Sequence, residues 1–395
     1  MSLEETYDPF MPLVVEGNPY PLYDDMRRTA PRLFLPRYNA WFFSTFEDVW
    51  NLSKLRELSV EGGIAPGQLL LGVGGNPLMV SQMDPPTHTA YRSTLNALFK
   101  PSAAQALENA IREEARRILK PIKDAGGGDL LMEFAGPLSA TAGCWLSGLP
   151  EEDALQLMAW TNKFFHRHPG KPGDTEVGAQ GGMEMIAYIT TVMNDIKSGK
   201  RTATGGAMSL LLEKQKSDPA VSDDHIIYIV LNLQIAAADT VPKAICATLH
   251  RLWENPSERA LLRADPKLSL DAFLEAVRLD MPTQMQGRTA TAPIALDEFT
   301  IEPGQKTMFM FASANRDPAE FEDPNAFRVT RNNRRTLGFG NGIHRCLGVH
   351  VAEIEGKAAI EEVISLLPDY QIDLSRSHHH KTEYVKGWSH LAVTC

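Results

Sequence analysis

The residues best suited to chemistry lie in one glycine-rich segment, Phe339-Gly-Asn-Gly-Ile-His-Arg-Cys-Leu-Gly348. Apolar residues at helical spacing follow its cysteine, namely Leu347, Val351, Ile354 and Ala358. This spacing predicts a helix that runs to about Leu367, with Cys346 at its N-terminus. Free backbone N–H groups and the positive end of a helix dipole lower the pKa of a thiol there. We therefore expect Cys346 to be a thiolate that binds a metal such as iron.

The neighbours of Cys346 suit a flat, negatively charged partner. Gly340, Gly342 and Gly348 let the backbone turn tightly and approach such a partner closely. His344 and Arg345 supply hydrogen-bond donors for carboxylates. A lone cysteine in a glycine-rich turn is usually just a buried cysteine, but ten residues in this order favour a cofactor site.

The segment resembles the haem-binding loop of the cytochromes P450, Phe-x-x-Gly-x-His/Arg-x-Cys-x-Gly. The matching residues are Phe339, Gly342, His344, Cys346 and Gly348, and the resemblance continues to Ala352 and Glu355. It implies a haem b whose iron is bound by Cys346, since that family uses a cysteine thiolate as haem ligand. It also implies that Phe339, Gly340, His344 and Gly348 contact the haem.

Length and composition indicate a soluble globular protein with a sizeable core. No linker, repeat or low-complexity tract divides the 395 residues, so we expect a single domain over 1–395. The N-terminus lacks the pattern of a signal peptide and no run of eighteen apolar residues occurs, which predicts a cytoplasmic protein without a membrane partner. The net charge of −10 argues against nucleic acid as a partner. The four cysteines show neither zinc spacing nor Cys-x-x-Cys pairs.

A long helix is predicted from the capping signal Ser222-Asp-Asp224 to Trp253, where Asn255-Pro256 stops it. Asp239 and Thr240 lie at its middle. A buried carboxylate is costly unless it is paired or used, although spacing alone leaves open a polar pair that faces solvent.

The middle of this helix resembles the oxygen-binding motif of the P450 family, Ala-Gly-x-Asp/Glu-Thr. The resemblance implies that Asp239 and Thr240 are catalytic residues that deliver protons to bound dioxygen. Ala237 stands where glycine is usual. Pro242 cannot donate to the Ala238 carbonyl, so we expect it to open the helix near the oxygen site.

Three further basic residues match positions that hold the haem propionates in the family. His88 and Arg92 are four apart on a helix that opens at Asp84-Pro-Pro-Thr87, with Thr87 available as its cap, and Arg288 lies further along the chain. Taken alone, the His88/Arg92 pair would more often face solvent. Guanidinium and carboxylate groups bind strongly when sheltered from water, which favours the functional interpretation.

Other matches concern the scaffold and the substrate. Glu275, Arg278 and Arg331 match a buried ion cluster that supports the cysteine loop. Residues expected near the substrate are Leu69 to Leu71, Val73, Met79, Thr283 to Gln286 and Trp388. The polar members predict a substrate with at least one hydrogen-bonding group. For Trp388, a place in the core is the default interpretation, and the resemblance adds contact with the substrate as the alternative.

A basic stretch surrounds the cysteine loop and predicts a docking patch for an acidic redox partner. Its arginines are Arg328, Arg331, Arg334, Arg335 and Arg345, and no acidic residue occurs between Asn325 and Ala352. The alternative, a solvated charge cluster, applies about equally to each arginine.

Taken together, the resemblance predicts a mainly α fold with a small β portion, in which haem lies between the long helix and the cysteine-loop helix. The predicted activity is a monooxygenase. It would use dioxygen and two electrons, passed from NAD(P)H through ferredoxin reductase and ferredoxin, to hydroxylate a small, largely apolar molecule such as a terpenoid, steroid or aromatic compound. A peroxide-driven haem-thiolate enzyme and a non-catalytic haem-binding sensor are the alternatives. No flavin, iron–sulfur or anchor segment is evident, which predicts separate soluble partners.

Overall fold

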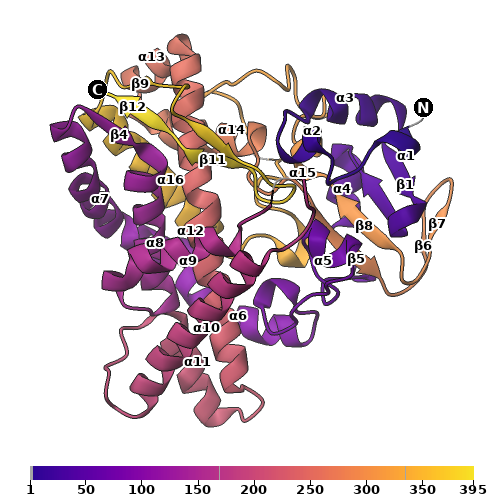
Figure 1. Cartoon of the computed structure of the whole chain (residues 1–395), viewed down its shortest axis with the longest axis horizontal. Coiled ribbons are helices and arrows are strands. Elements are labelled where there is room, and N and C mark those ends of the chain that lie inside the picture. Colours follow the sequence, from indigo (N-terminus) through magenta and orange to yellow (C-terminus); the bar gives the residue numbers. More distant parts are fainter. Residues whose placement is uncertain (1–2, 169, 334) are drawn as a thin grey trace.

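A computed structural model describes residues 3–168, 170–333 and 335–395. A helical body makes up most of it, and a smaller β-rich part lies at one side (Figure 1). The α-helices are α1 (Leu3–Thr6), α2 (Pro12–Val15), α3 (Tyr20–Thr29), α4 (Phe46–Leu52), α5 (Pro66–Leu70), α6 (Thr87–Phe99), α7 (Pro101–Asp124), α8 (Gly136–Ser147), α9 (Ala154–Phe164), α10 (Glu176–Lys197), α11 (Gly206–Ser217), α12 (Asp223–Glu254), α13 (Pro256–Ala264), α14 (Ser269–Leu279), α15 (Phe311–Ala314) and α16 (Val349–Leu366). The predicted mainly α architecture is confirmed.

The largest sheet joins the N-terminal region to residues near 300. Its order is β1 (Arg32–Leu35), β2 (Ala40–Phe43), β8 (Lys306–Phe309), β5 (Gln286–Ala290) and β3 (Leu58–Ser59). Only β2 and β8 are parallel neighbours in this sheet. The smaller sheets are β4 (Gly127–Asp129) with β12 (Ala392–Thr394) and β9 (Gln371–Ile372), β6 (Ile294–Ala295) with β7 (Thr300–Ile301), and β10 (His378–His380) with β11 (Gly387–His390).

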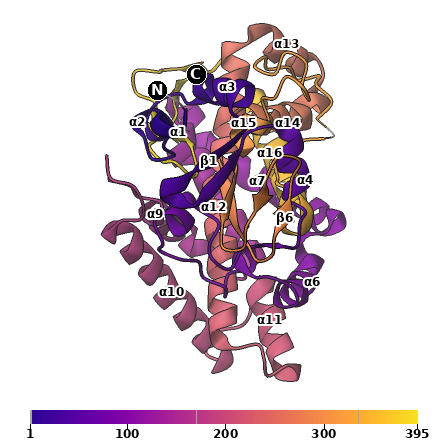
Figure 2. The same ribbon diagram turned by 90° about the vertical axis from the view of Figure 1, so that its right-hand side faces the viewer.

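Helix α12 runs through the middle of the helical body (Figures 1 and 2). It has 32 residues and is therefore roughly 48 Å long. As predicted, Ser222 caps it, because Ser222 Oγ accepts a hydrogen bond from the backbone N–H of His225. The helix continues through Pro242 without interruption. Among the described residues it is the one helix long and apolar enough to pass for a membrane span, but 67% of its apolar window is buried inside the protein, as in a core helix.

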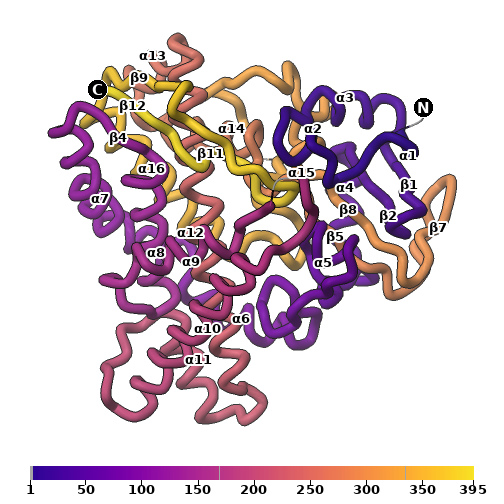
Figure 3. The backbone as a smooth tube through the Cα atoms, in the orientation of Figure 1, coloured from indigo at the N-terminus to yellow at the C-terminus, as the bar shows by residue number. Residues whose placement is uncertain are grey.

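Helix α16, which follows the cysteine loop, packs against α7, α14 and α12. Its first residue is Val349, so Cys346 lies three residues before the helix rather than within its first turn. Thr87 similarly differs from expectation, since it is the first residue of α6 and not its cap. The C-terminal hairpin β10–β11 crosses the body beside α12 (Figure 3).

The predicted ion cluster is present at the base of the cysteine loop. Glu275 and Arg278 are fully buried, and Glu275 accepts from Arg278 Nε at 2.8 Å and from Arg331 Nε at 2.9 Å. Arg278 Nη1 also donates to the carbonyls of Asn315 and Pro324, both at 2.8 Å. The cluster thereby fastens α14 to the segment that leads into the cysteine loop.

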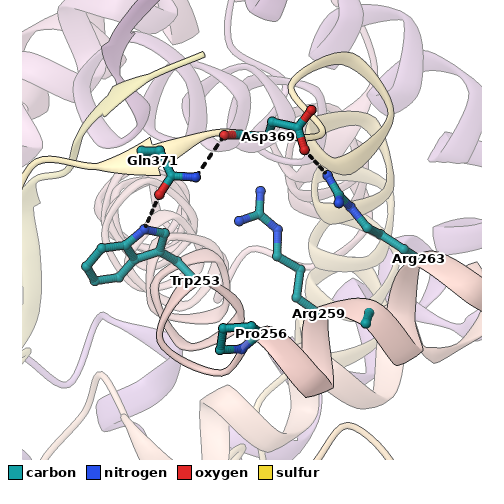
Figure 4. A pocket seen from close by; sticks show the side chains of 7 residues that line it. Trp253, Pro256, Arg259, Arg263, Asp369 and Gln371 are labelled. Atoms are coloured by element: carbon teal, nitrogen blue, oxygen red, sulfur yellow. Dashed lines mark hydrogen bonds and ion pairs between the residues drawn. The ribbon is translucent and has the colours of Figure 1, made fainter.

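A surface cavity of about 300 Å³ lies between α13 and the turn that follows α16 (Figure 4). Its arginines bind the turn: Arg259 Nη2 donates to the Pro368 carbonyl at 2.7 Å, and Arg263 pairs with Asp369 at 2.8 Å. Trp253 Nε1 donates to Gln371 Oε1 at 3.2 Å on the opposite side. These contacts give the polar groups of the cavity a structural role, because they hold α13 against the turn that follows α16.

Candidate functional site

A second cavity, of about 590 Å³, brings the predicted site together inside the protein. The cysteine loop, α12, α6 and β5 each contribute to its wall. The site residues that line it are Arg92, Thr240, Arg288, Phe339, Gly340, His344, Cys346 and Gly348. These residues are separated by up to 256 positions in the chain, so the fold, and not local sequence, creates the site.

The cysteine loop is held in shape by main-chain contacts. Gly340 and Gly342 have φ angles of 68° and 74°, which favour glycine. A Cβ atom on Gly342 would lie 2.7 Å from the Ser53 carbonyl oxygen, so this position has no room for a side chain. The backbone N–H of Cys346 donates to the Phe339 carbonyl at 2.8 Å and closes the loop. Asn341 Nδ2 donates to the Trp50 carbonyl, also at 2.8 Å, and ties the loop to α4.

The predicted acidic thiol is not found at Cys346. The side chain is accessible from the cavity that it lines. Nevertheless, the surrounding protein raises the pKa of the Cys346 thiol, and the backbone N–H of Gly348 together with Arg92 and Arg345 only partly opposes this. The expectation that the helix N-terminus lowers this pKa is therefore wrong, since α16 begins three residues later. A coordinated metal cation, in contrast, would deprotonate the thiol outright.

Four basic residues gather beside Cys346 without an acidic partner. Arg92, Arg288 and His344 line the cavity, whereas His88 does not line it but packs against His344; no ion pair among the described residues involves any of the four. The rings of His88 and His344 are 4.3 Å apart, and the Nε2 atoms of both are buried without a hydrogen-bond partner. Burial, together with Arg288, His88 and Arg92, lowers the pKa of His344 to about 3.

Arg288 is the most isolated charge of this group. It is 5% exposed, and its Nη1 atom donates to the carbonyl of the preceding residue, Gly287, at 2.7 Å. Burial lowers the pKa of Arg288 to about 10. Uncompensated buried cations and orphaned donors beside a cysteine require an anionic partner. The two propionates of a haem have the charge and the hydrogen-bond acceptors to fill this need, so the residues present fit the cofactor that the sequence predicts.

The two polar residues at the centre of α12 have different surroundings. Thr240 lines the cavity, and its Oγ1 donates to the Ala236 carbonyl at 3.0 Å. Asp239 is buried behind the cavity wall and pairs with Lys243, which is also buried. The remaining oxygen of Asp239, Oδ2, has no hydrogen-bond partner. Sequence reasoning missed Lys243, although its spacing of four from an acid on one helix was a usable signal.

The residues expected near substrate divide into two groups. Met79, Thr283 and Gln286 line the cavity as predicted. Leu69 and Leu70 instead belong to the core beneath the large sheet, whereas Leu71 and Val73 are exposed at the surface. Trp388 belongs to the core, where it stacks on His379, and it does not line the cavity.

Arg167 is a cavity residue that the sequence did not reveal. It follows α9, and its side chain is only 8% exposed. Arg167 Nη2 lies 3.2 Å from Asp174, and Nε lies 3.6 Å from Glu383. Burial of an arginine in a polar loop has no local sequence signal, because it depends on the C-terminal segment that packs over the loop.

Most of the predicted basic patch is neutralised. Arg328 pairs with Asp323, Arg331 with Glu275, and Arg335 with Glu47 and Glu320. Arg334 lies outside the described residues. Arg345 is exposed, so it is the member of the described set that remains available at the surface beside the cysteine loop.

Comparison with known proteins agrees with this geometry. The family model described as Cytochrome P450 matches residues 270–382, which include the ion cluster and the cysteine loop. Cytochrome P450 130 of Mycobacterium tuberculosis is 28% identical over 389 residues, covering 91% of this chain and 90% of the relative. The vitamin D(3) 25-hydroxylase of Pseudonocardia autotrophica is 28% identical over 392 residues, covering 95% of this chain and 94% of the relative.

The fold is shared as well. The crystal structure of ligand-free CYP164A2 from Mycobacterium smegmatis superposes with a TM-score of 0.86 at 25% identity and covers 98% of both chains. The family model, the relatives and the fold thus agree with the geometry of the site, in which a cysteine faces a cavity next to unpaired basic residues. The chain is thus similar in sequence and in fold to bacterial cytochromes P450, and these similarities together support a cytochrome P450 monooxygenase of the bacterial type.

Proposed function

We propose that the cavity binds haem b with Cys346 Sγ as the iron ligand. His88, Arg92, Arg288 and His344 would then hold the propionates. The observation that carries this proposal is the group of four basic residues that share no ion pair with the described residues and lie beside the one cysteine of the cavity. Phe339, Gly340 and Gly348 would contact the haem from the cysteine side. When bound, the haem supplies the capacity to activate dioxygen.

We assign the catalytic proton transfers to Thr240 and Asp239. Thr240 lines the cavity, so its hydroxyl can donate to a ligand there when it releases the Ala236 carbonyl. Asp239 is adjacent but faces Lys243. A rotation of the Asp239 side chain away from Lys243 would let it take a proton from solvent and pass it to Thr240, which replaces the proton that Thr240 gives up. Lys243 thereby positions the carboxyl group of Asp239.

The substrate we propose is a small, largely apolar organic molecule, of the terpenoid, steroid or aromatic kind, that carries at least one hydrogen-bonding group. Apolar residues of α8, α12 and α14 line the cavity together with Thr283, Gln286 and Tyr384. Tyr384 Oη accepts from Gln286 Nε2 at 3.3 Å, which places two polar groups side by side for a substrate hydroxyl or carbonyl. The hydroxylase named for vitamin D(3) is a relative whose name fits this class.

We further propose that the chain is a single cytoplasmic domain over 1–395 that receives two electrons from NAD(P)H through ferredoxin reductase and ferredoxin. The exposed Arg345 beside the cysteine loop supports an acidic partner, although the ion pairs of its neighbours reduce the positive charge of this surface. Substrate-dependent consumption of NADH, with one oxygen atom of dioxygen recovered in the product, is the expected outcome with a ferredoxin pair.

The decisive test of the site is the carbon monoxide difference spectrum of the reduced protein. We expect the strongly red-shifted Soret band of thiolate-bound haem in the wild type and its loss in Cys346→Ser. Cys395→Ser is the matched control, because Cys395 is also exposed but does not line the cavity, and this variant should retain the band. A band that survives in Cys346→Ser, or a wild type that takes up no haem, would refute the proposal.

A further inference from the structure

Helix α16 carries a buried carboxyl group that the proposed chemistry does not use. Glu355 is 2% exposed and lies nine residues after Cys346. It shares a helix face with Val351 and Ala352, and all three residues line the cavity. Glu355 is therefore the ionisable side chain that α16 presents to the cofactor side.

Glu355 has no cationic partner among the described residues. The described contact of its carboxyl group is the hydroxyl of Ser139 on α8, which donates to Oε1. Burial raises the pKa of Glu355 to about 7, and the Ser139 hydrogen bond acts in the opposite direction. Within the described part of the chain, burial and the Ser139 hydrogen bond account for this shift in pKa.

Apart from His88 and Arg92, which take part in no ion pair among the described residues, the charged residues named below pair with residues other than Glu355. On α16 itself, Glu361 and Glu362 pair with Arg112, and Glu353 with His350. The charged groups on the packing elements are Glu108, Arg112 and Arg116 on α7, Glu275 and Arg278 on α14, Asp239 and Lys243 on α12, His88 and Arg92 on α6, and Lys357 on α16.

Glu362 provides an internal comparison on the same helix. Its side chain is 7% exposed, and it accepts from Arg116 Nε at 2.8 Å and lies 3.3 Å from Arg112 Nη1. An almost equally buried glutamate is thus paired with two arginines where α16 faces α7. Among the described residues no cation pairs with Glu355, where the same helix faces the cavity, so a charge gained by a group in the cavity would act on an unpaired carboxyl group.

We propose that Glu355 is a redox-linked protonation site: its carboxylate binds one proton from solvent when the cofactor held by Cys346 accepts one electron. This inference rests on the proposed haem site. The electron comes from the external reductant, the proton forms an O–H bond on Glu355, and no bond to the cofactor forms or breaks. The electron adds a negative charge to the cofactor, and this charge repels the negative carboxylate of Glu355 in an interior that screens charges poorly. Uptake of a proton by Glu355 removes this repulsion.

The test is the reduction potential of the haem-loaded protein, measured spectroelectrochemically at a series of pH values on both sides of 7. Reduction should raise the affinity of Glu355 for a proton, so the wild-type potential should fall as pH rises through this window and level off on either side. The slope can reach at most a tenfold change in the equilibrium per pH unit, which is about 59 mV for one electron. A flat wild-type potential across the window would overturn the proposal.

Two variants and a control assign the effect to Glu355. Glu355→Gln should have a potential that is independent of pH in this window and equal to the acid plateau of the wild type. Ser139→Ala should shift the sloping region to higher pH, because the lost hydrogen bond had lowered the pKa of Glu355. Glu361→Gln alters a carboxyl of α16 that pairs with Arg112 at 2.5 Å and should keep the wild-type profile. The proton would be assigned to another group if the slope of potential against pH were unchanged in Glu355→Gln. The same would hold if the sloping region did not move to higher pH in Ser139→Ala.

An infrared difference spectrum, reduced minus oxidised, gives a second readout. The carbonyl stretch of a protonated carboxyl group should appear in the wild type and be missing in Glu355→Gln. Failure of the inference is distinguishable from failure of the haem proposal. A red-shifted carbon monoxide band with a flat potential refutes only the role of Glu355, whereas absence of the band refutes the site on which it rests.

Discussion

Arg288 should lower the stability of the haem-free protein but raise its affinity for haem. Its guanidinium is buried without a carboxylate, and its pKa is lowered to about 10. At about 1.4 kcal/mol per pKa unit, this shift corresponds to a cost of about 3 kcal/mol for the charged group. Arginine is protonated at neutral pH in both the folded and the unfolded chain, because both pKa values lie well above 7. The cost is therefore constant near neutrality and declines only as pH rises through 10.

Replacement of Arg288 by methionine removes this cost together with the hydrogen bond to the Gly287 carbonyl, which is worth about 1 kcal/mol. We expect Arg288→Met to stabilise the haem-free protein by about 2 kcal/mol in urea unfolding at pH 7. The same change should weaken haem binding by about 10- to 100-fold, since a hydrogen bond between charged groups contributes roughly 1.5–3 kcal/mol. Haem transfer to an acceptor protein measures that loss.

Arg316 is the matched control for Arg288. It is 6% exposed, but it donates to the Leu279 carbonyl at 2.9 Å, to Asn325 Oδ1 at 2.9 Å, and lies 3.4 Å from Asp280. Arg316→Met should therefore destabilise the haem-free protein. A destabilised Arg288→Met protein, or one that retains haem like the wild type, would refute the reasoning that this charge is kept for an anionic ligand.

Three further predictions concern other parts of the site. Thr240→Ala should divert more of the consumed NADH to hydrogen peroxide while the haem spectrum is preserved; unchanged peroxide yield would remove Thr240 from the proton path. Glu275→Gln should lower the free energy of unfolding by about 3–5 kcal/mol, because Arg278 and Arg331 lose their counter-charge in a buried site; a loss below about 1 kcal/mol would show that the cluster is not needed for stability. Glu355→Gln should be more stable than the wild type above pH 7 by up to about 3 kcal/mol and no more stable below about pH 4.5, since the folded protein binds the Glu355 proton more tightly than the unfolded chain. A stability difference that is constant with pH would contradict the raised pKa.

Local signals predicted the elements that carry the site. The Ser222 cap and the Asn255-Pro256 stop define α12, and two of the three glycines that the sequence singled out in the cysteine loop, Gly340 and Gly342, occupy positive φ angles. These features depend on a few neighbouring residues, and so they can be read from the chain. The resemblance to the P450 family then located the basic residues, which come together only in three dimensions.

Contacts between distant segments account for what the sequence did not predict. Arg335 meets Glu47 from 288 positions away, so the charge of the cysteine-side surface could not be inferred from the basic stretch alone. The pairing of Asp239 with Lys243 is local, because the two residues lie four apart on α12, but the packing of α12 decides that Thr240 lines the cavity and Asp239 does not. The pKa of Cys346 depends on how deeply the folded chain encloses the loop and not on its position before a helix.

The attachment of the cysteine loop to α4 has an evolutionary consequence. Asn341 binds the main-chain carbonyl of Trp50, and Gly342 packs on that of Ser53, so neither contact depends on which side chains stand at positions 50 and 53. Substitutions can therefore accumulate at these positions while the loop remains seated, as long as the helix keeps its place. A lineage can in this way replace about three quarters of its residues, as the comparison with the Mycobacterium smegmatis protein illustrates, and still inherit the same architecture.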